Sequence, residues 1–198
     1  AVASNQLVLG FEHRPALGEG SFLIADSNRD AVAWIDRWPD WPGRILAVHG
    51  PPGAGKTHLS HVWQRRCDAQ RLDAGQLDQT FLETWPGKGT ALVIENGDQG
   101  VDETVLFHVI NLVREDKGYL LLTGREAPAR WPVDLPDLGS RLAAMTAVQL
   151  GPPDDQLIAA VLTKQFQDRQ LRVPGDVVAY LVARMERSFA AIGQTVAA

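Results

Sequence analysis

The residue types best suited to chemistry in this chain gather in one glycine-rich octapeptide. It consists of Gly50, Pro51, Pro52, Gly53, Ala54, Gly55, Lys56 and Thr57, and it fits the pattern G-x-x-x-x-G-K-[ST]. The backbone N–H groups of such a loop can turn inward onto phosphate oxygens, and a helix that begins there adds partial positive charge. Lys56 would then reach the β- and γ-phosphates, and the Thr57 hydroxyl would bind Mg²⁺. The octapeptide therefore predicts a nucleotide-binding loop.

The sequence on both sides of the octapeptide supports this interpretation. Residues 45–48 are a short apolar run typical of a buried strand, and residues 57–63 can continue as a helix. A turn between two core elements is the alternative, and it would explain the glycines but not the Lys-Thr pair. His58, at the start of the helix, joins the eight loop residues as a candidate nucleotide contact.

An acidic partner for Mg²⁺ is expected at the end of a neighbouring apolar strand. Residues 91–94 form such a run, and Glu95 and Asn96 follow it. The usual pattern places an aspartate on the metal and then a second acid that polarises the attacking water. Glu95 can serve Mg²⁺ directly or through water, whereas Asn96 cannot act as a base. We therefore expect nucleotide binding with slow hydrolysis. The alternative for Glu95 is a carboxylate left at a strand end.

Three other polar residues have less specific settings. Arg141 lies on a predicted short helix, and an arginine at a domain face can stabilise charge on a phosphoryl group of a neighbouring molecule. From spacing alone, a surface salt bridge explains Arg141 better. Thr123 follows the fourth strand and Arg187 lies in the helical C-terminal region. Their ordinary alternatives are a strand-end hydroxyl and a solvated arginine.

Strands and helices alternate along most of the chain. Strand-like runs fall at 45–49, 69–73, 91–94, 119–123 and 147–150, and helical patterns at 28–38, 57–66, 77–85 and 102–116. This order predicts an α/β fold, namely a three-layer αβα P-loop NTPase domain with a parallel sheet. After residue 151 the pattern becomes purely helical, at 154–168, about 175–186 and from 188 onward. The last region predicts a small C-terminal all-helical lid.

We expect three parts along the chain. Residues 1–20 form an N-terminal arm, residues 21–152 the nucleotide-binding domain, and residues 153–198 the helical lid. The last helical pattern reaches Ala198 without a stop signal, as in a lid that is cut short.

Composition argues against several classes of protein. The chain has 198 residues, of which 45% are hydrophobic and 22% charged, with a net charge of −5 and one cysteine, Cys67. The negative charge argues against a strongly basic nucleic-acid surface, and one cysteine allows no intrachain disulfide. No apolar run approaches the length of a membrane span, and the N-terminus has no signal pattern. We therefore expect a soluble, cytoplasmic protein.

The N-terminal arm contains a second notable segment, which consists of Gln6, Leu7, Val8, Leu9, Gly10 and Phe11. An extended peptide with one amide side chain and apolar anchors at Leu7, Leu9 and Phe11 can dock in a groove of a partner. The alternative is an edge strand that packs on its own domain.

Together these residues resemble the AAA+ ATPases of the DnaA replication-initiator type, and most closely the small Hda-type regulators, which lack the initiator's DNA-binding domain. The resemblance runs through nearly the whole chain. It implies that residues 50–57 are the Walker A loop, that Glu95 and Asn96 lie at Walker B, and that the ligand is ADP or ATP with Mg²⁺. Asparagine at the second Walker B position is compatible with Hda-type members.

The resemblance also assigns roles around the nucleotide. The segment that contains Phe22 and Asn28 would open the module near the adenine. Residues 121–128, which include Thr123, resemble the sensor 1 strand and turn, although Arg125 stands where an aspartate often follows. Arg187 falls where the lid's sensor 2 arginine is expected.

Two further matches imply partners. Residues 135–142 match the family's arginine-finger box, which favours Arg141 as a finger that acts in trans. Residues 6–11 look like the hexapeptide with which replication proteins bind the β sliding clamp. The resemblance thus implies a clamp-tethered negative regulator of replication initiation that stimulates ATP hydrolysis by DnaA. DNA would be reached only through the clamp, and head-to-tail association could give a homo-oligomer.

An active AAA+ motor or a clamp-loader-like replication ATPase is the alternative function. Such an enzyme should have an acid at position 96, where this chain has Asn96. A non-enzymatic adaptor between clamp and initiator would not depend on Arg141. An initiator proper would carry a DNA-binding helix-turn-helix beyond the lid.

Overall fold

The structure is a computed structural model that describes residues 23–85, 90–115 and 117–197. The predicted clamp-binding segment at 6–11 and the predicted adenine contact Phe22 lie outside the described residues. Their roles stay predictions.

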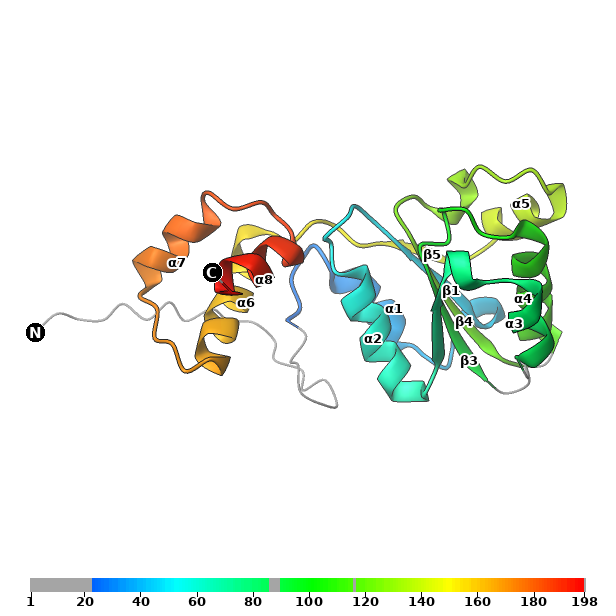
Figure 1. Ribbon diagram of the computed structural model, residues 1–198, viewed down its shortest axis with the longest axis horizontal. Helices are drawn as coiled ribbons and strands as arrows, with labels where there is room; N and C mark the ends of the chain where they lie inside the picture. The colour runs from blue at the N-terminus through cyan, green and yellow to red at the C-terminus, as the bar shows by residue number, and fades with distance from the viewer. Residues whose placement is uncertain (1–22, 86–89, 116, 198) are drawn as a thin grey trace, which may run out of the picture.

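A five-stranded parallel sheet forms the centre of the larger part of the molecule (Figure 1). Its strands are β1 (Ile45–His49), β2 (Gln70–Asp73), β3 (Ala91–Glu95), β4 (Tyr119–Gly124) and β5 (Ala147–Gln149), and their spatial order is β2-β3-β4-β1-β5. Strands β1, β3 and β4 are buried almost throughout, which explains their continuous apolar runs. Because these three strands are neighbours and parallel, the loops that follow them meet at one edge of the sheet.

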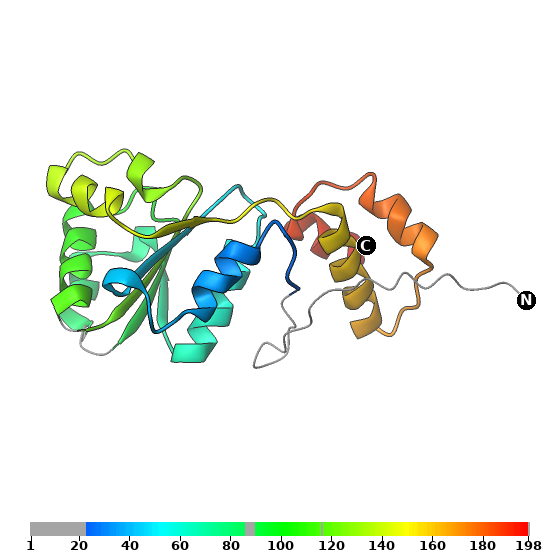
Figure 2. The same ribbon diagram turned by 180° about the vertical axis from the view of Figure 1, so that it is seen from behind.

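Helices cover both faces of the sheet. One face packs against α1 (Arg29–Asp36) and α2 (Lys56–Cys67), where the fully buried Trp63 lies against the stacked ring of Trp41. The other face packs against α3 (Gln79–Thr84), α4 (Glu103–Glu115) and α5 (Pro136–Ala143). Figures 1 and 2 show the two helical layers on opposite sides of the strands. The predicted three-layer α/β fold is confirmed.

The C-terminal helices form a separate small core. They are α6 (Asp155–Asp168), α7 (Gly175–Val182) and α8 (Phe189–Ala197). Ile158 and Leu162 of α6 pack there with Ile192 of α8. The Asp154 carboxylate caps α6 by accepting a hydrogen bond of 2.7 Å from the Leu157 N–H. Figure 2 shows the extended segment after β5 crossing from the sheet to this helical part.

Helix α7 is shorter than the sequence predicts. The periodicity suggested a helix to residue 186, but α7 ends at Val182. Its end is tightened by hydrogen bonds from the N–H groups of Arg184 and Met185 to the Leu181 carbonyl. The Ser188 hydroxyl then accepts from the Ala191 N–H and begins α8, so the chain must turn before that point.

Short 3₁₀ turns complete the described structure, at Pro42–Arg44, Ala74–Gln76 and Pro128–Arg130. Among the helices that the structure describes, none combines the length and the apolar character needed to cross a membrane.

Candidate nucleotide-binding site

The glycine-rich loop joins β1 to α2, and its backbone adopts conformations that require glycine. Gly53 has a φ of 74° and Gly55 a φ of 99°, both in the left-handed region. A Cβ at Gly53 would lie 2.4 Å from the Ser188 Cβ, and one at Gly55 would lie 2.9 Å from the Phe189 ring. The Phe189 N–H also donates to the Gly53 carbonyl at 3.1 Å. The loop therefore lies directly against the start of α8.

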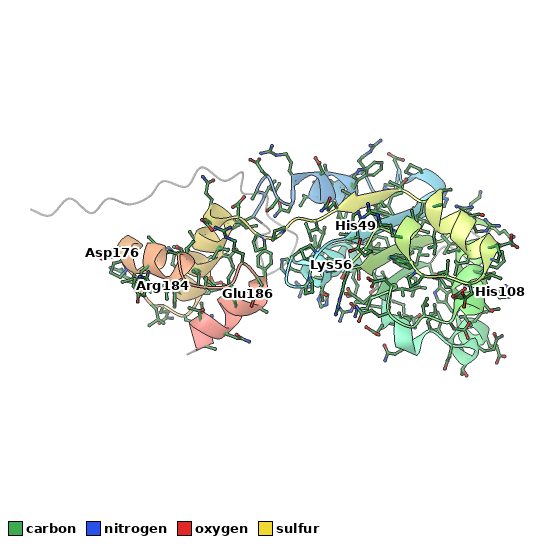
Figure 3. All side chains as sticks on the ribbon, turned by 90° about the horizontal axis from the view of Figure 1, so that it is seen from above. His49, Lys56, His108, Asp176, Arg184 and Glu186 are labelled. Atoms are coloured by element: carbon green, nitrogen blue, oxygen red, sulfur yellow. The ribbon has the colours of Figure 1, made fainter. Side chains whose placement is uncertain are left out.

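Lys56 lies over the loop that it terminates. Its Nζ donates to the Gly50 carbonyl at 2.6 Å and to the Pro51 carbonyl at 2.9 Å. Burial lowers the pKa of this ammonium, and the nearby Asp98 carboxylate raises it. In Figure 3 Lys56 lies between the helical C-terminal part and the bulk of the sheet domain. The position fits a cation that neutralises phosphate charge.

Glu95, at the end of β3, is the centre of a cluster of hydroxyl groups. The carboxylate accepts hydrogen bonds from Thr57 Oγ1 at 2.8 Å and from Thr123 Oγ1 at 3.3 Å. A short hydrogen bond from the Ser60 hydroxyl reaches its other oxygen, and Arg71 lies 3.8 Å away. Only 7% of Glu95 is exposed. Strand β3 and helix α2 thus bring the two predicted Mg²⁺ ligands together.

The oxygen atoms of Thr57 and Glu95 fit a magnesium ion. Mg²⁺ is held by one or two protein oxygens together with water and phosphate oxygens. Within the described ranges no cluster of three or more His, Cys, Asp and Glu side chains could hold a metal by itself. Bound Mg²⁺ would supply positive charge against the phosphate oxygens.

Asn96 is turned away from this cluster. Its backbone is left-handed, with a φ of 57°, and its Nδ2 donates to Asp73 Oδ2 at 2.6 Å. Asp73 ends β2, on the outer side of β3. The Asn96 backbone N–H donates to Thr123 Oγ1 at 3.2 Å, so Thr123 links the ends of β3 and β4.

Sequence reasoning missed two residues of this region. Ser60 lies three positions after Thr57, on the same face of α2, and that helical spacing was the available signal. Asp98 follows Glu95 by three positions, in the loop before α4. Its Oδ2 accepts from the N–H groups of Arg125 at 2.7 Å and Glu126 at 3.3 Å. The sequence held no signal for this contact, because it joins two loops far apart in the chain.

Asn28 shapes the segment before α1. It is 3% exposed, its Oδ1 accepts from the Ala25 N–H, and its Nδ2 donates to the Leu23 carbonyl, both at 2.9 Å. Leu23 and Ala25 pack against Leu157 of α6. Both ends of the amide are therefore used inside the chain, and Asn28 positions this segment beside the helical part. His58 lies in the first turn of α2.

The side chains of the two predicted arginines have their partners outside the phosphate loop. Arg187 forms a two-pronged ion pair with Asp155 at the start of α6, with N···O distances of 3.0 and 3.1 Å. The Arg141 guanidinium, on α5, lies 5.2 Å from the centre of the Phe107 ring of α4. His108, whose ring neighbours that of Phe107, lies in Figure 3 at the far end of the molecule from the helical part.

Known proteins resemble this chain in sequence at a low level. The chain matches no protein-family model. The chromosomal replication initiator protein DnaA of Symbiobacterium thermophilum is 24% identical over 212 residues, which cover 94% of this chain and 46% of that protein. The chain thus spans about half the length of this curated relative.

Solved structures resemble it more clearly. AMPPCP-bound DnaA from Aquifex aeolicus has a TM-score of 0.74 at 15% identity, covering 89% of this chain and 62% of that one. Domain III of DnaA from Thermotoga maritima has a TM-score of 0.66 at 20% identity, with coverages of 88% and 84%. The chain has a DnaA-like AAA+ P-loop ATPase fold. A RuvB variant from Thermotoga maritima shares the AAA+ fold, with a TM-score of 0.67 at 12% identity over 86% of this chain and 60% of that one.

The AAA+ fold explains which candidate residues meet. The glycine-rich loop, Glu95 and Thr123 follow or end β1, β3 and β4, so they converge at the same edge of the sheet. Arg141 belongs to α5, and the Arg187 side chain pairs with Asp155 although the next residue, Ser188, packs against the loop.

Proposed function

We propose that this chain is an Hda-type negative regulator of DNA replication initiation. It binds an adenine nucleotide, with ADP expected as the resident form, and it stimulates ATP hydrolysis by DnaA through Arg141. Residues 6–11 tether it to the β sliding clamp in the cytoplasm. The DnaA-like AAA+ fold and the 24% identity to a DnaA protein support a place in replication initiation.

The nucleotide would be held by this chain's own loop. Backbone N–H groups of residues 50–57 face the phosphates, Lys56 neutralises them, and the Thr57 and Glu95 oxygens bind Mg²⁺. The base would lie near Asn28, between the sheet domain and the helical lid. If Arg187 turned from Asp155 toward a phosphate, it would give up an exposed ion pair worth only about 0–1 kcal/mol.

The position of Arg141 is the observation that carries the regulatory proposal. Its guanidinium stacks over Phe107, whose ring neighbours that of His108, and Figure 3 shows His108 at the far end of the molecule from the helical part, away from Lys56. A finger presented there acts on the nucleotide of a neighbouring molecule rather than on its own, and such fingers contribute roughly 10³–10⁵-fold in rate. Asn96 agrees with this role, because an amide that donates to Asp73 cannot itself act as a base for hydrolysis.

The proposal is tested by comparing hydrolysis rates. Steady-state ATP hydrolysis is measured for this chain alone, for DnaA alone and for both together with clamp loaded on DNA. We expect slow turnover by each protein alone and at least tenfold faster hydrolysis in the mixture. Fast turnover by this chain alone would favour the motor or clamp-loader-like alternative.

The tether is tested separately. Replacement of Gln6, Leu7 and Leu9 by alanine should abolish co-elution of this chain with the clamp in gel filtration. The same variant should still bind ADP as the wild type does, because the replaced residues precede the nucleotide site. Unchanged co-elution would contradict the proposal that residues 6–11 bind the clamp.

A further inference from the structure

Asp98 is an acidic residue that the proposed function leaves without a role. It lies in the loop between β3 and α4, two positions beyond Asn96. Its Oδ2 is held by the backbone N–H groups of Arg125 and Glu126 in the turn after β4. Asn96 reaches outward to β2, whereas Asp98 reaches inward to β4, the neighbour of β1. Unlike the Asn96 side chain, the Asp98 carboxylate therefore lies toward the end of β4, which is the neighbour of β1.

The second oxygen of this carboxylate is unpaired among the described residues. Within the described part of the chain, Asp98 Oδ1 is buried and has no hydrogen-bond partner. Buried polar atoms are nearly always hydrogen-bonded, so an oxygen of this kind points to a donor from outside the chain. The anchoring of Oδ2 fixes the direction in which Oδ1 can accept.

The surroundings of Asp98 place it beside the phosphate loop. Burial lowers the pKa of the Lys56 ammonium, and the Asp98 carboxylate raises it. The Gly50 N–H of the loop donates at 3.2 Å to the carbonyl of Gly124, which lies beside Asp98. Two glycines allow the close packing. A Cβ on Gly124 would lie 3.3 Å from Asp98 Cγ, and a Cβ on Gly97 would lie 2.4 Å from the Trp131 ring. The carboxylate thus stands where the loops after β1, β3 and β4 meet.

We propose that Asp98 is the second carboxylate of the nucleotide site and that its Oδ1 accepts a proton from the water that attacks the γ-phosphate. This inference rests on the proposed binding of ATP at the loop. The water oxygen forms a bond to the γ-phosphorus, and the bond from that phosphorus to the β,γ-bridging oxygen breaks, so that ADP and phosphate are the products. The water proton passes to Asp98. A positioned general base contributes roughly 10²–10⁴-fold in rate.

Asp98→Asn tests this role with little change in shape. The asparagine oxygen can still accept from Arg125 and Glu126, but the negative charge is lost. We expect single-turnover ATP hydrolysis, with the chain in excess, to fall by roughly 100-fold or more. The affinity for ATP relative to ADP, measured by calorimetry, should stay the same or rise, because a like charge beside the γ-phosphate is removed.

Asp102→Asn is the matched control. It removes a charge from the same loop, and asparagine can keep the cap that Asp102 gives to the Val105 N–H. Its hydrolysis and its affinities should match those of the wild type. Thermal unfolding of all variants checks that they are folded.

Five outcomes separate the explanations. The expected loss of hydrolysis with retained nucleotide affinity supports the inference. Unchanged hydrolysis in Asp98→Asn overturns it, as does a wild type that binds ATP but does not hydrolyse it. If Asp98→Asn and Asp98→Ala both lose ADP binding together with hydrolysis, Asp98 only supports the turn, and the inference is overturned. A wild type that binds neither nucleotide would overturn the proposed function itself.

Discussion

At the scale of residues, the site depends on how one buried carboxylate is satisfied. Glu95 is 7% exposed and accepts hydrogen bonds from the hydroxyls of Thr57, Ser60 and Thr123. Three donors compensate the cost of burying its charge. The Thr57 hydroxyl proton now points at the Glu95 carboxylate. A cation bound between these two side chains would take the place of that proton and would carry a larger positive charge. The cluster therefore couples the ends of β3 and β4 to the start of α2.

Glu95→Gln should weaken the dependence of nucleotide binding on Mg²⁺. The amide has nearly the shape of the carboxylate but lacks the charge that attracts a divalent cation. We expect the gain in ATP affinity on adding Mg²⁺ to fall by about tenfold or more, in calorimetric titrations with and without EDTA. Asp102→Asn serves as the charge control. If Glu95→Gln keeps the full Mg²⁺ effect, Glu95 is not a metal ligand.

Cys67 should make stability depend on pH in a predictable direction. Burial raises the pKa of its thiol from 9.0 to about 11. The unfolded chain therefore loses the thiol proton first, so the contribution of Cys67 to stability is full below pH 9 and declines toward pH 11. The free energy of unfolding in urea, wild type minus Cys67→Ala, should decrease between pH 8 and pH 10. A difference that stays constant would contradict the shift.

At the scale of elements, the loop between β1 and α2 is held by the start of α8. The Phe189 N–H donates to the Gly53 carbonyl, and the Ser188 side chain occupies the space beside Gly53. The phosphate loop is thus packed against the helical lid. A substitution in the loop should therefore affect the stability of both the sheet domain and the lid.

Gly53→Ala should destabilise the protein more than Gly100→Ala does. Both glycines have a positive φ, 74° and 70°, so alanine costs about 1 kcal/mol or more of backbone strain at either position. Only Gly53 has a close neighbour, because the added methyl group would lie 2.4 Å from the Ser188 Cβ, whereas Gly100 has open space. The loss of unfolding free energy in each variant is measured by urea unfolding. Equal losses would show that Ser188 moves aside without cost when alanine replaces Gly53.

The elements also show what the sequence could predict. Composition and hydrophobic period predict the buried strands β1, β3 and β4 and the amphipathic helix α4. Together these elements indicate the fold class. The meeting of Glu95 with Thr57 followed from a known loop pattern. The end of α7 and the contact of Asp98 with the turn after β4 could not be predicted, because each depends on packing between segments distant in the chain.

At the scale of the whole molecule, Arg141 lies away from Lys56, because it contacts Phe107, the ring neighbour of His108 at the far end of the molecule from the lid. Lys56 lies between the sheet domain and the lid, whereas Arg141 stacks on Phe107 of α4. Molecules arranged head to tail would bring such an arginine face to the nucleotide face of the next molecule. The proposed regulator needs this geometry if it is to complete the site of a partner.

The proposal that Arg141 stimulates hydrolysis by DnaA has a direct test. ATP hydrolysis by DnaA is measured with loaded clamp and either the wild-type chain or Arg141→Ala. Arg169→Ala, which removes an exposed arginine at the end of α6, is the matched control. We predict that Arg141→Ala loses nearly all of the stimulation, at least tenfold, while Arg169→Ala stimulates as the wild type does. Equal stimulation by Arg141→Ala and the wild type would contradict the finger assignment and would leave this chain as an adaptor between clamp and initiator.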